Sequence, residues 1–280
     1  MLALIRGAGD LASGIALRLW RSGISVVMTE LPRPTVIRRT VSFADAVTSG
    51  TMTVEDVTAQ LAADAREAKE LLAQGVIPVL ADPECRCRGE LNPDVVVDAI
   101  LAKRNLGTRI TDAPIVIGVG PGFTAGEDCH AVVETMRGHT LGRVFYTGSA
   151  LPNTNIPGLI GGFAGERVLR APSDGVFTGA KKIGDLVREG DIVGYVAGMP
   201  MRATISGVLR GLLADGVAVK RGMKSGDVDP RGEVSYCDIV SDKANAVAGG
   251  VLEAILHLSG ALREKKTEEM CDEKNFARIG

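Results

Sequence analysis

The first half of the chain alternates short apolar runs with segments of helical spacing. Residues 2–6 and 25–29 are apolar runs that predict buried strands, and residues 11–21 between them have the pattern of an amphipathic helix. Residues 54–74 contain helix formers with apolar spacing, which predicts a second helix. Further apolar runs follow within GVIPVLADPE (76–80), PDVVVDAILAKRN and APIVIGVGPG. This alternation predicts an α/β fold with a Rossmann-like parallel sheet.

From about residue 168 the pattern changes to short apolar runs separated by glycines. Five glycines recur at one ungapped offset of 32 residues: Gly175, Gly179, Gly184, Gly190 and Gly194 match Gly207, Gly211, Gly216, Gly222 and Gly226. Val176 and Val187 match Val208 and Val219 at the same offset. Such a match predicts a duplicated β unit.

The turn pattern of this repeat, with APSDGVF and GDLVREGDIV, resembles the biotinyl/lipoyl carrier fold, a small all-β barrel-sandwich hybrid. In that family the hairpin between the halves presents a lysine flanked by methionines. Here the corresponding stretch is GMPM, with Pro200 in the place of the lysine. Because proline has no amine to acylate, biotin and lipoate are excluded at Pro200.

These patterns divide the chain into four parts. Residues 1–167 are expected to form a Rossmann-like nucleotide- or cofactor-binding domain, and residues 168–235 the duplicated barrel-sandwich β domain. Residues 236–262 are expected to form a C-terminal helix that docks back, with Ser241 as its N-cap. Residues 263–280 are expected to be a charged tail.

Composition narrows the classes of partner. The chain has 280 residues, a net charge of -2 and 45% hydrophobic residues, so it shows no basic footprint for nucleic acid or for an anionic membrane. No apolar stretch is long enough for a membrane span. Five cysteines are an odd number in a chain without a secretion signal, which favours reduced thiols and a cytoplasmic location.

The turn after the first predicted strand has the spacing GxGxxA. Gly7, Gly9 and Ala12 lie between a predicted strand and helix, where backbone N–H groups can approach a phosphate. Glu30 closes the second strand, where an acid can accept ribose hydroxyls. Asp10 beside the second glycine would repel a pyrophosphate unless it caps the helix or meets a metal. The motif predicts a nucleotide site of the NAD(P) type, and the alternative is a tight turn without a ligand.

A second glycine-rich loop, GVGPGFTAGEDCH, follows the run at 115–119. Gly120 and Gly122 could bring backbone close to a ligand, so we expect them to line the cofactor pocket. The alternative is a surface loop that joins two strands.

Four residues are candidates for thiol or metal chemistry. Cys85 and Cys87 form a C-x-C in DPECRCRGE, where neighbouring arginines would favour thiolates. They are the candidate catalytic residues. Cys129 and His130 add a thiol and an imidazole, a ligand set acceptable to zinc, although the identity of any metal is unknown. The alternative is that these are inert thiols.

Taken together, IRGAGDLASGIA, VVDAILAKRNLGT, IGVGPGFTAGEDCHAVVETMRGH and the glycine repeat resemble the YqeB-like family over residues 1 to about 262. Those proteins are accessory to selenium-dependent molybdenum hydroxylase systems, and the family is similar in spirit to XdhC-type maturation factors. The resemblance implies a role in maturation of a xanthine or purine dehydrogenase. The expected partner is then the molybdenum hydroxylase apoenzyme or its assembly machinery.

The resemblance carries over Gly7, Gly9, Asp10, Gly120 and Gly122 as pocket loops. It makes a molybdopterin nucleotide a second candidate for the phosphate site, and Cys85 and Cys87 candidate handlers of selenium or sulfur. Two alternatives to maturation stay open, an NAD(P)-dependent oxidoreductase and a non-enzymatic scaffold for hydroxylase assembly. A homo-oligomer is compatible with each of them.

Overall fold

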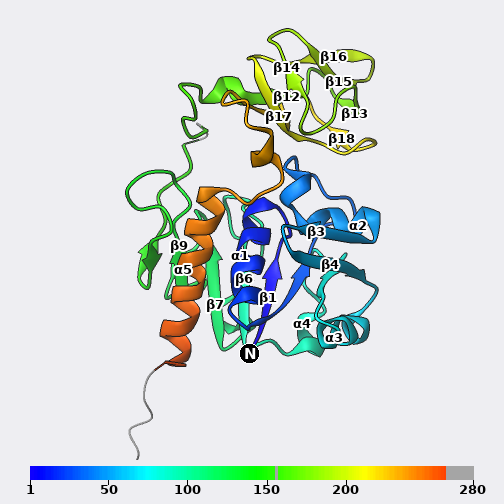
Figure 1. Ribbon diagram of the computed structural model, residues 1–280. Coiled ribbons are helices and arrows are strands. Elements are labelled where there is room, and N and C mark those ends of the chain that lie inside the picture. Colours follow the sequence, from blue (N-terminus) through cyan, green and yellow to red (C-terminus); the bar gives the residue numbers. More distant parts are fainter. Residues whose placement is uncertain (155–156, 263–280) are drawn as a thin grey trace, which may run out of the picture.

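The computed structural model describes residues 1–154 and 157–262. The predicted charged tail, 263–280, lies outside the described residues, as does Cys271. The described part has a large sheet covered by helices and, over residues 168–229, a region built of short strands (Figure 1). No helix among the described residues has the length and apolar character that crossing a membrane requires.

The large sheet has nine strands in the order β10-β9-β7-β6-β1-β2-β5-β4-β3. The interior pairs from β9 to β4 are parallel, whereas β10 and β3 pair antiparallel at the two edges. Their bounds are β1 (Leu2–Arg6), β2 (Ser25–Thr29), β3 (Thr51–Val54), β4 (Val57–Ala62), β5 (Ile77–Leu80), β6 (Val95–Asp98), β7 (Ile115–Val119), β9 (Ala131–Val133) and β10 (Val144–Phe145). A separate ladder joins β8 (Thr124–Ala125) to β11 (Gly148–Ser149).

The sheet is buried on both faces, which explains its continuous apolar runs. In β1, Ala3 and Ile5 belong to one core and Leu4 to another, because successive side chains point to opposite faces. One face is covered by α1 (Asp10–Arg21) and α5 (Asp242–Ser259), the other by α3 (Ala65–Ala73) and α4 (Arg88–Leu91). The short α2 (Ala46–Ser49) and two 3-10 turns, η1 (Arg39–Val41) and η2 (Phe43–Asp45), lie between β2 and β3.

The C-terminal helix α5 lies beside α1 on the same face of the sheet (Figure 1). Ser241 caps it, since its side chain accepts a hydrogen bond from the Ala244 N–H at 3.2 Å. A Cβ atom on Gly14 would lie 2.7 Å from the Cβ atom of Ala244. The small residue at position 14 therefore permits close packing of the two helices.

The helix predicted over residues 54–74 was wrong in its first part. Residues 51–62 form the hairpin β3–β4, whose turn holds Glu55 at φ 55°, and α3 begins only at Ala65. The β-branched residues of TMTVEDVT favour strands. Asp64 then starts the helix by accepting from the Glu67 N–H at 2.9 Å.

The repeat in the second half of the chain is confirmed at the level of strands. Each strand of the first copy begins 32 residues before its counterpart in the second copy. The pairs are β13 (Gly175–Gly179) with β17 (Gly207–Leu212), β14 (Leu186–Val187) with β18 (Ala218–Val219), and β15 (Ile192–Val196) with β19 (Lys224–Asp229). We call residues 168–229 the repeat region.

The two copies exchange strands. The sheets run in the orders β12-β19-β17-β14 and β16-β15-β13-β18, so each contains a short strand of the other copy. The strands outside the repeat are β12 (Val168–Arg170) and β16 (Met199–Arg202), with the 3-10 turn η4 (Gly165–Arg167) before them and η5 (Val234–Cys237) after. Pro200 lies in β16, opposite Tyr195 of β15.

The predicted fold class, a Rossmann-like parallel sheet with a barrel-sandwich hybrid domain, needs correction. The sheet is mixed, because β3 returns from a tight hairpin and β10 returns after β9, and both connections are too short for a parallel crossover. The repeat region forms two four-stranded sheets, and nothing in the comparisons below supports the barrel-sandwich label.

Candidate functional site

A cavity of about 1050 Å³ opens where the carboxyl ends of β1, β2 and β6 meet. Strand β1 connects through α1 to β2 on one side and pairs with β6 on the other, which is the switch point where open α/β sheets bind ligands. We call this cavity the main cleft. It is lined by Arg6, Gly7, Gly9, Asp10, Leu11, Ala12, Thr29, Glu30, Leu31, Thr35, Val36, Pro83, Glu84, Cys85, Arg88, Val96, Ala99, Ile100, Leu101, Lys103, Leu106, Gly107, Arg109, Asp112, Lys224 and Lys243.

The turn from β1 to α1 presents free backbone donors to this cleft. Gly7 has φ 95° and donates its N–H to the Thr29 carbonyl at 2.8 Å. The first N–H bonded within the turn of α1 is that of Ser13, which reaches the Gly9 carbonyl at 2.8 Å. Among the described residues no acceptor is recorded for the N–H groups from Gly9 to Ala12, and no side chain caps the helix. Such unpaired donors at a helix N-terminus favour an anion.

Glu30 lies at the end of β2, as the sequence predicted, but its carboxylate turns back to the loop. One oxygen accepts from the Ala8 N–H at 2.9 Å and the other from the Leu31 N–H at 2.7 Å. A carboxylate oxygen can accept more than one hydrogen bond, so Glu30 keeps acceptor capacity toward the cleft.

Two lysines from distant parts of the chain reach the main cleft near Asp10. Lys224 begins β19 of the repeat region, and Lys243 lies in the first turn of α5. Desolvation lowers the pKa of each ammonium, and the negative charge of Asp10 opposes that shift in both. Neither ammonium has an ion pair or a hydrogen bond within the described residues. An anion bound beside them would therefore relieve an electrostatic cost.

Asp10 and Ala12, two other predicted site residues, also line the main cleft. Ala12 is buried in the first turn of α1. Asp10 is the first residue of the helix and lies near both lysines, so its carboxylate has cationic neighbours that offset its repulsion of a phosphate.

Arg6 forms a buried polar cluster at the floor of the cleft. Its guanidinium donates to the Asp98 carboxylate at 3.1 Å and also contacts the Thr108 hydroxyl, which donates to the same carboxylate at 2.5 Å. Within the described residues the Arg6 Nε has no hydrogen-bond partner. The cluster fixes Arg6 beneath the glycine turn and offsets most of its charge.

The Cys85 and Cys87 thiols influence each other's ionisation. The neighbouring Cys87 thiol lowers the pKa of the Cys85 thiol, and the charges of Arg6 and Arg88 act in the same direction. The neighbouring Cys85 sulfur raises the pKa of the Cys87 thiol, as do burial and Asp82. The sequence had named Arg86 as an activating charge, but Arg86 is exposed and pairs with Glu84.

Gly120 and Gly122 lie against the protein itself and do not line the main cleft. A Cβ atom on Gly122 would lie 2.6 Å from the Arg104 backbone, and one on Gly120 would lie 2.8 Å from the Thr135 hydroxyl. Pro121 between them lines a smaller cavity of about 190 Å³, which shares Leu11, Leu101, Lys103 and Lys243 with the main cleft. The close packing of two loops is sufficient reason for these glycines.

Cys129 and His130 have other partners. The Cys129 thiol is buried, which raises its pKa to about 11, and it contacts the Thr124 carbonyl at 3.9 Å. The Nδ1 atom of His130 accepts from the Val116 N–H at 3.0 Å. In residues 1–154 and 157–262 no group of three or more His, Cys, Asp or Glu side chains is arranged to hold a metal ion. The metal assignment stays a prediction.

Sequence reasoning missed the two lysines and Asp98. Lys224 could have been found, because its counterpart in the first copy of the repeat is Ile192. A charge that replaces an apolar residue within a repeat marks a changed environment. Lys243 and Asp98 carry no such signal, since each joins the site only through the tertiary fold.

Comparisons with known proteins return one curated relative of close sequence. The chain is 56% identical over 257 residues to "Uncharacterized protein YqeB" of Escherichia coli (strain K12). That match covers 92% of this chain but 48% of the relative, so the chain spans about half the length of the curated relative it matches. No family model matches the chain.

The similar solved structures are distant. An aspartoacylase family protein from Mesorhizobium loti is 12% identical, with 58% of this chain and 60% of that chain covered and a TM-score of 0.24. A succinylglutamate desuccinylase from Silicibacter is 15% identical, with 81% and 84% covered and a TM-score of 0.25. At such scores the similarity transfers neither fold nor activity to this chain.

These findings correct the functional expectations. The sequence relative is itself uncharacterized, and the structural neighbours are aspartoacylases and desuccinylases rather than XdhC-type or molybdenum hydroxylase maturation factors. Assignment to the maturation of a selenium-dependent molybdenum hydroxylase was therefore wrong on these findings. The two alternatives, an NAD(P)-dependent oxidoreductase and an assembly scaffold, fall with it.

Proposed function

We propose that the main cleft binds a ribonucleotide through its phosphate groups. The observation that carries the proposal is the set of unpaired N–H groups from Gly9 to Ala12, at the start of α1, which face a cleft also lined by Lys224 and Lys243. Helix N-termini and ammonium groups both favour phosphate. The activity proposed is binding, and no hydride transfer is implied.

Glu30 supports a ribose beside the phosphate. Its carboxylate ends β2 next to the glycine turn, where an acid can accept ribose hydroxyls and disfavours a 2′-phosphate. We therefore expect NAD or another nucleotide with a free 2′-hydroxyl to bind more tightly than NADP. A molybdopterin nucleotide shares the phosphate chemistry and stays an untested candidate ligand.

We also place this binding activity in the cytoplasm. The cysteines at positions 85, 87, 129 and 237 are free thiols, a state that a reducing compartment maintains.

The test is a thermal-shift and calorimetry series with NAD, NADP, ATP, CTP and inorganic pyrophosphate. A ligand at 100 times its Kd should stabilise the protein by ~2.7 kcal/mol, a readable shift in Tm. In the variant Gly9→Asp a carboxylate would occupy the anion position, and the affinity should fall at least about tenfold because like charges repel.

Gly9→Ala is the matched control. Position 9 has φ -67°, and a Cβ atom there would be 3.5 Å from Val36, so alanine fits without strain. It should keep the affinity within a few fold. If no nucleotide shifts the Tm, or if both variants lose binding equally, the phosphate site at α1 is refuted.

A further inference from the structure

The two cysteines of the C-x-C segment differ in their position relative to the main cleft. Cys85 lines the cleft and Cys87 does not, although both side chains are 7% exposed and belong to the core that α3 and α4 cover. A small molecule that enters the cleft therefore meets Cys85 first. Cys87 follows two residues later in the same turn.

A tight turn holds the two thiols in this arrangement. Cys85 donates its N–H to the Asp82 carbonyl at 3.0 Å, and the Cys87 N–H donates to the Asp82 carboxylate at 2.8 Å. Cys85 itself has φ 57°, a left-handed conformation that is strained for a cysteine. The turn imposes this conformation, and strain of this kind is commonly found at functional sites.

The two sulfurs differ in their cationic neighbours. The charge of Asp82 acts on both thiols, whereas Arg6 and Arg88, which line the same cleft, act on Cys85. The neighbouring Cys87 thiol lowers the pKa of the Cys85 thiol, and the neighbouring Cys85 sulfur raises the pKa of the Cys87 thiol. Cys85 is thus placed as a thiolate and Cys87 as the thiol that solvates it.

We propose that Cys85 and Cys87 form a thiol–disulfide exchange site, in which Cys85 attacks a low-molecular-weight disulfide and Cys87 resolves the product. The site is separate from the phosphate position at α1, and its chemistry needs no nucleotide in the cleft. If nucleotide binding fails its own test, this proposal is unaffected.

The reaction balances in two steps. The Cys85 thiolate attacks one sulfur of a disulfide R–S–S–R, so that a bond forms between Cys85 and R–S and the second R–S⁻ leaves and takes up a proton. The mixed disulfide carries no charge, so Cys87 loses the negative neighbour that held its proton. Cys87 then releases its proton to solvent and attacks the Cys85 sulfur, and the remaining R–S⁻ leaves. Two protein thiols are oxidised and one small disulfide is reduced to two thiols.

The experiment uses the full chain with Cys271→Ser, which removes the thiol outside the described residues, and 2,2′-dithiodipyridine as the small disulfide. We expect rapid release of two equivalents of thiopyridone and a Cys85–Cys87 bond in the peptide map. Cys129 and Cys237 are internal controls, because burial raises the pKa of both thiols. They should react at least about a hundredfold more slowly.

Two further variants separate the roles of the thiols. With Cys87→Ser, release should stop at one equivalent and the label should stay on Cys85. On lowering the pH, the reaction of Cys85 in this variant should slow at a higher pH than in the parent protein. The reason is that the Cys87 thiol, which lowers the pKa of Cys85, has been replaced by a hydroxyl. With Cys85→Ser, the fast phase should disappear.

Equal slow reaction of all four thiols in the folded parent protein would overturn the proposal without recourse to any variant. Retention of the label on Cys85 in the parent protein would overturn the resolving role of Cys87. So would a Cys87→Ser variant that still releases two equivalents.

Discussion

The two copies of the 32-residue repeat share their strand positions but not their surroundings. In the first copy, β13 alternates between buried and exposed positions, as a strand with one solvent face does. In the second copy, β17 and β19 are buried at nearly every position. One backbone pattern thus occupies two environments, and the sequence differs where the environments differ.

The difference is concentrated at charged positions. At four aligned sites within β17 and β19 the second copy carries a charge where the first has none: Arg210 for Thr178, Lys224 for Ile192, Asp227 for Tyr195, and Asp229 for Ala197. Three of these, all except Lys224, join a buried ionic network with Arg167 and Arg231. Lys224 instead reaches the main cleft.

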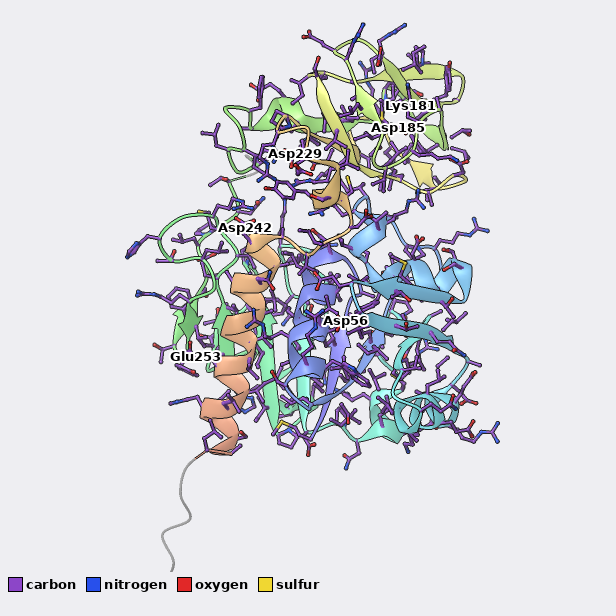
Figure 2. All side chains as sticks on the ribbon, in the orientation of Figure 1. Asp56, Lys181, Asp185, Asp229, Asp242 and Glu253 are labelled. Carbon is purple, nitrogen blue, oxygen red and sulfur yellow. The ribbon has the colours of Figure 1, made fainter. Side chains whose placement is uncertain are left out.

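The second copy differs from the first because it contacts the segment that follows β2. The Leu212 N–H donates to the Ile37 carbonyl at 2.7 Å, and Arg39 donates back to the Leu212 carbonyl at 3.0 Å. Figure 2 labels two residues on either side of this junction, Asp229 in the repeat region and Asp242 at the start of α5 below it. Departures from internal symmetry therefore mark the surface where the repeat region meets the site.

The largest expected effect comes from Asp227→Ala. Its carboxylate accepts from Arg167 at 2.7 Å and from Arg210 at 2.7 and 3.0 Å, and all three residues are buried. Removal of the carboxylate would leave the buried Arg167 guanidinium without its counter-ion and Arg210 with Asp229 alone, which costs ~3–5 kcal/mol of unfolding free energy. Urea denaturation measures this loss of unfolding free energy.

Tyr195→Ala, at the aligned position of the first copy, is the control. Tyr195 is 38% exposed and has no buried ion pair within the described part of the chain, so the loss should stay below ~1 kcal/mol. If the two substitutions destabilise equally, the environments of the two copies do not differ as described.

Much of this organisation was predictable from the sequence, and the limit has a physical cause. The β1–α1 turn and the duplicated strands follow from local spacing, because glycines and apolar periodicity determine them within a few residues. Glu30 was found because its position relative to Gly7 is set by a single βαβ unit.

The missed features depend on long-range contacts. The apolar run after Asp98 gives no sign that its carboxylate would hold Arg6, 92 residues earlier in the chain. The guanidinium groups of Arg38 and Arg39 likewise donate to the Tyr236 and Leu212 carbonyls, which lie 198 and 173 residues later in the chain. The sequence around these arginines gives no sign of either partner.

The second prediction concerns the stability of the folded protein at low pH. Burial raises the pKa of Asp229, but hydrogen bonds from Arg231 and the charge of Arg210 outweigh this effect and hold the pKa below its usual range. The stabilisation is therefore complete above the pKa of the unfolded chain, about 3.9. It is lost as the pH falls through the lower pKa of the folded protein.

Asp229→Asn should accordingly cost ~2 kcal/mol at neutral pH, where a charged hydrogen-bond acceptor is lost, and progressively less as the pH falls. Denaturation curves from pH 7 to pH 2 measure the convergence. Ala197→Asn, at the aligned position, should leave the shape of the pH curve unchanged. A constant gap between Asp229→Asn and the parent protein would contradict the assignment.

The smallest effect on folding, and the one that bears most directly on the cleft, is expected for Lys224→Ile. This substitution gives the second copy the residue of the first, so it removes one departure from the repeat. Since desolvation lowers the pKa of Lys224, its charge does not stabilise the fold, and the unfolding free energy should change by less than ~0.5 kcal/mol. Affinity for the nucleotide should fall about tenfold, because a charged hydrogen bond contributes ~1.5 kcal/mol.

Lys220→Ile is the matched control, because Lys220 belongs to the same copy but is exposed outside the main cleft. Calorimetry with the best nucleotide should show no change in Kd for this variant. If Lys224→Ile binds as tightly as the parent protein while Gly9→Asp does not, the phosphate is held by α1 without a contribution from Lys224. The charge at position 224 would then belong to the junction between the repeat region and the sheet, with the other three departures from the repeat.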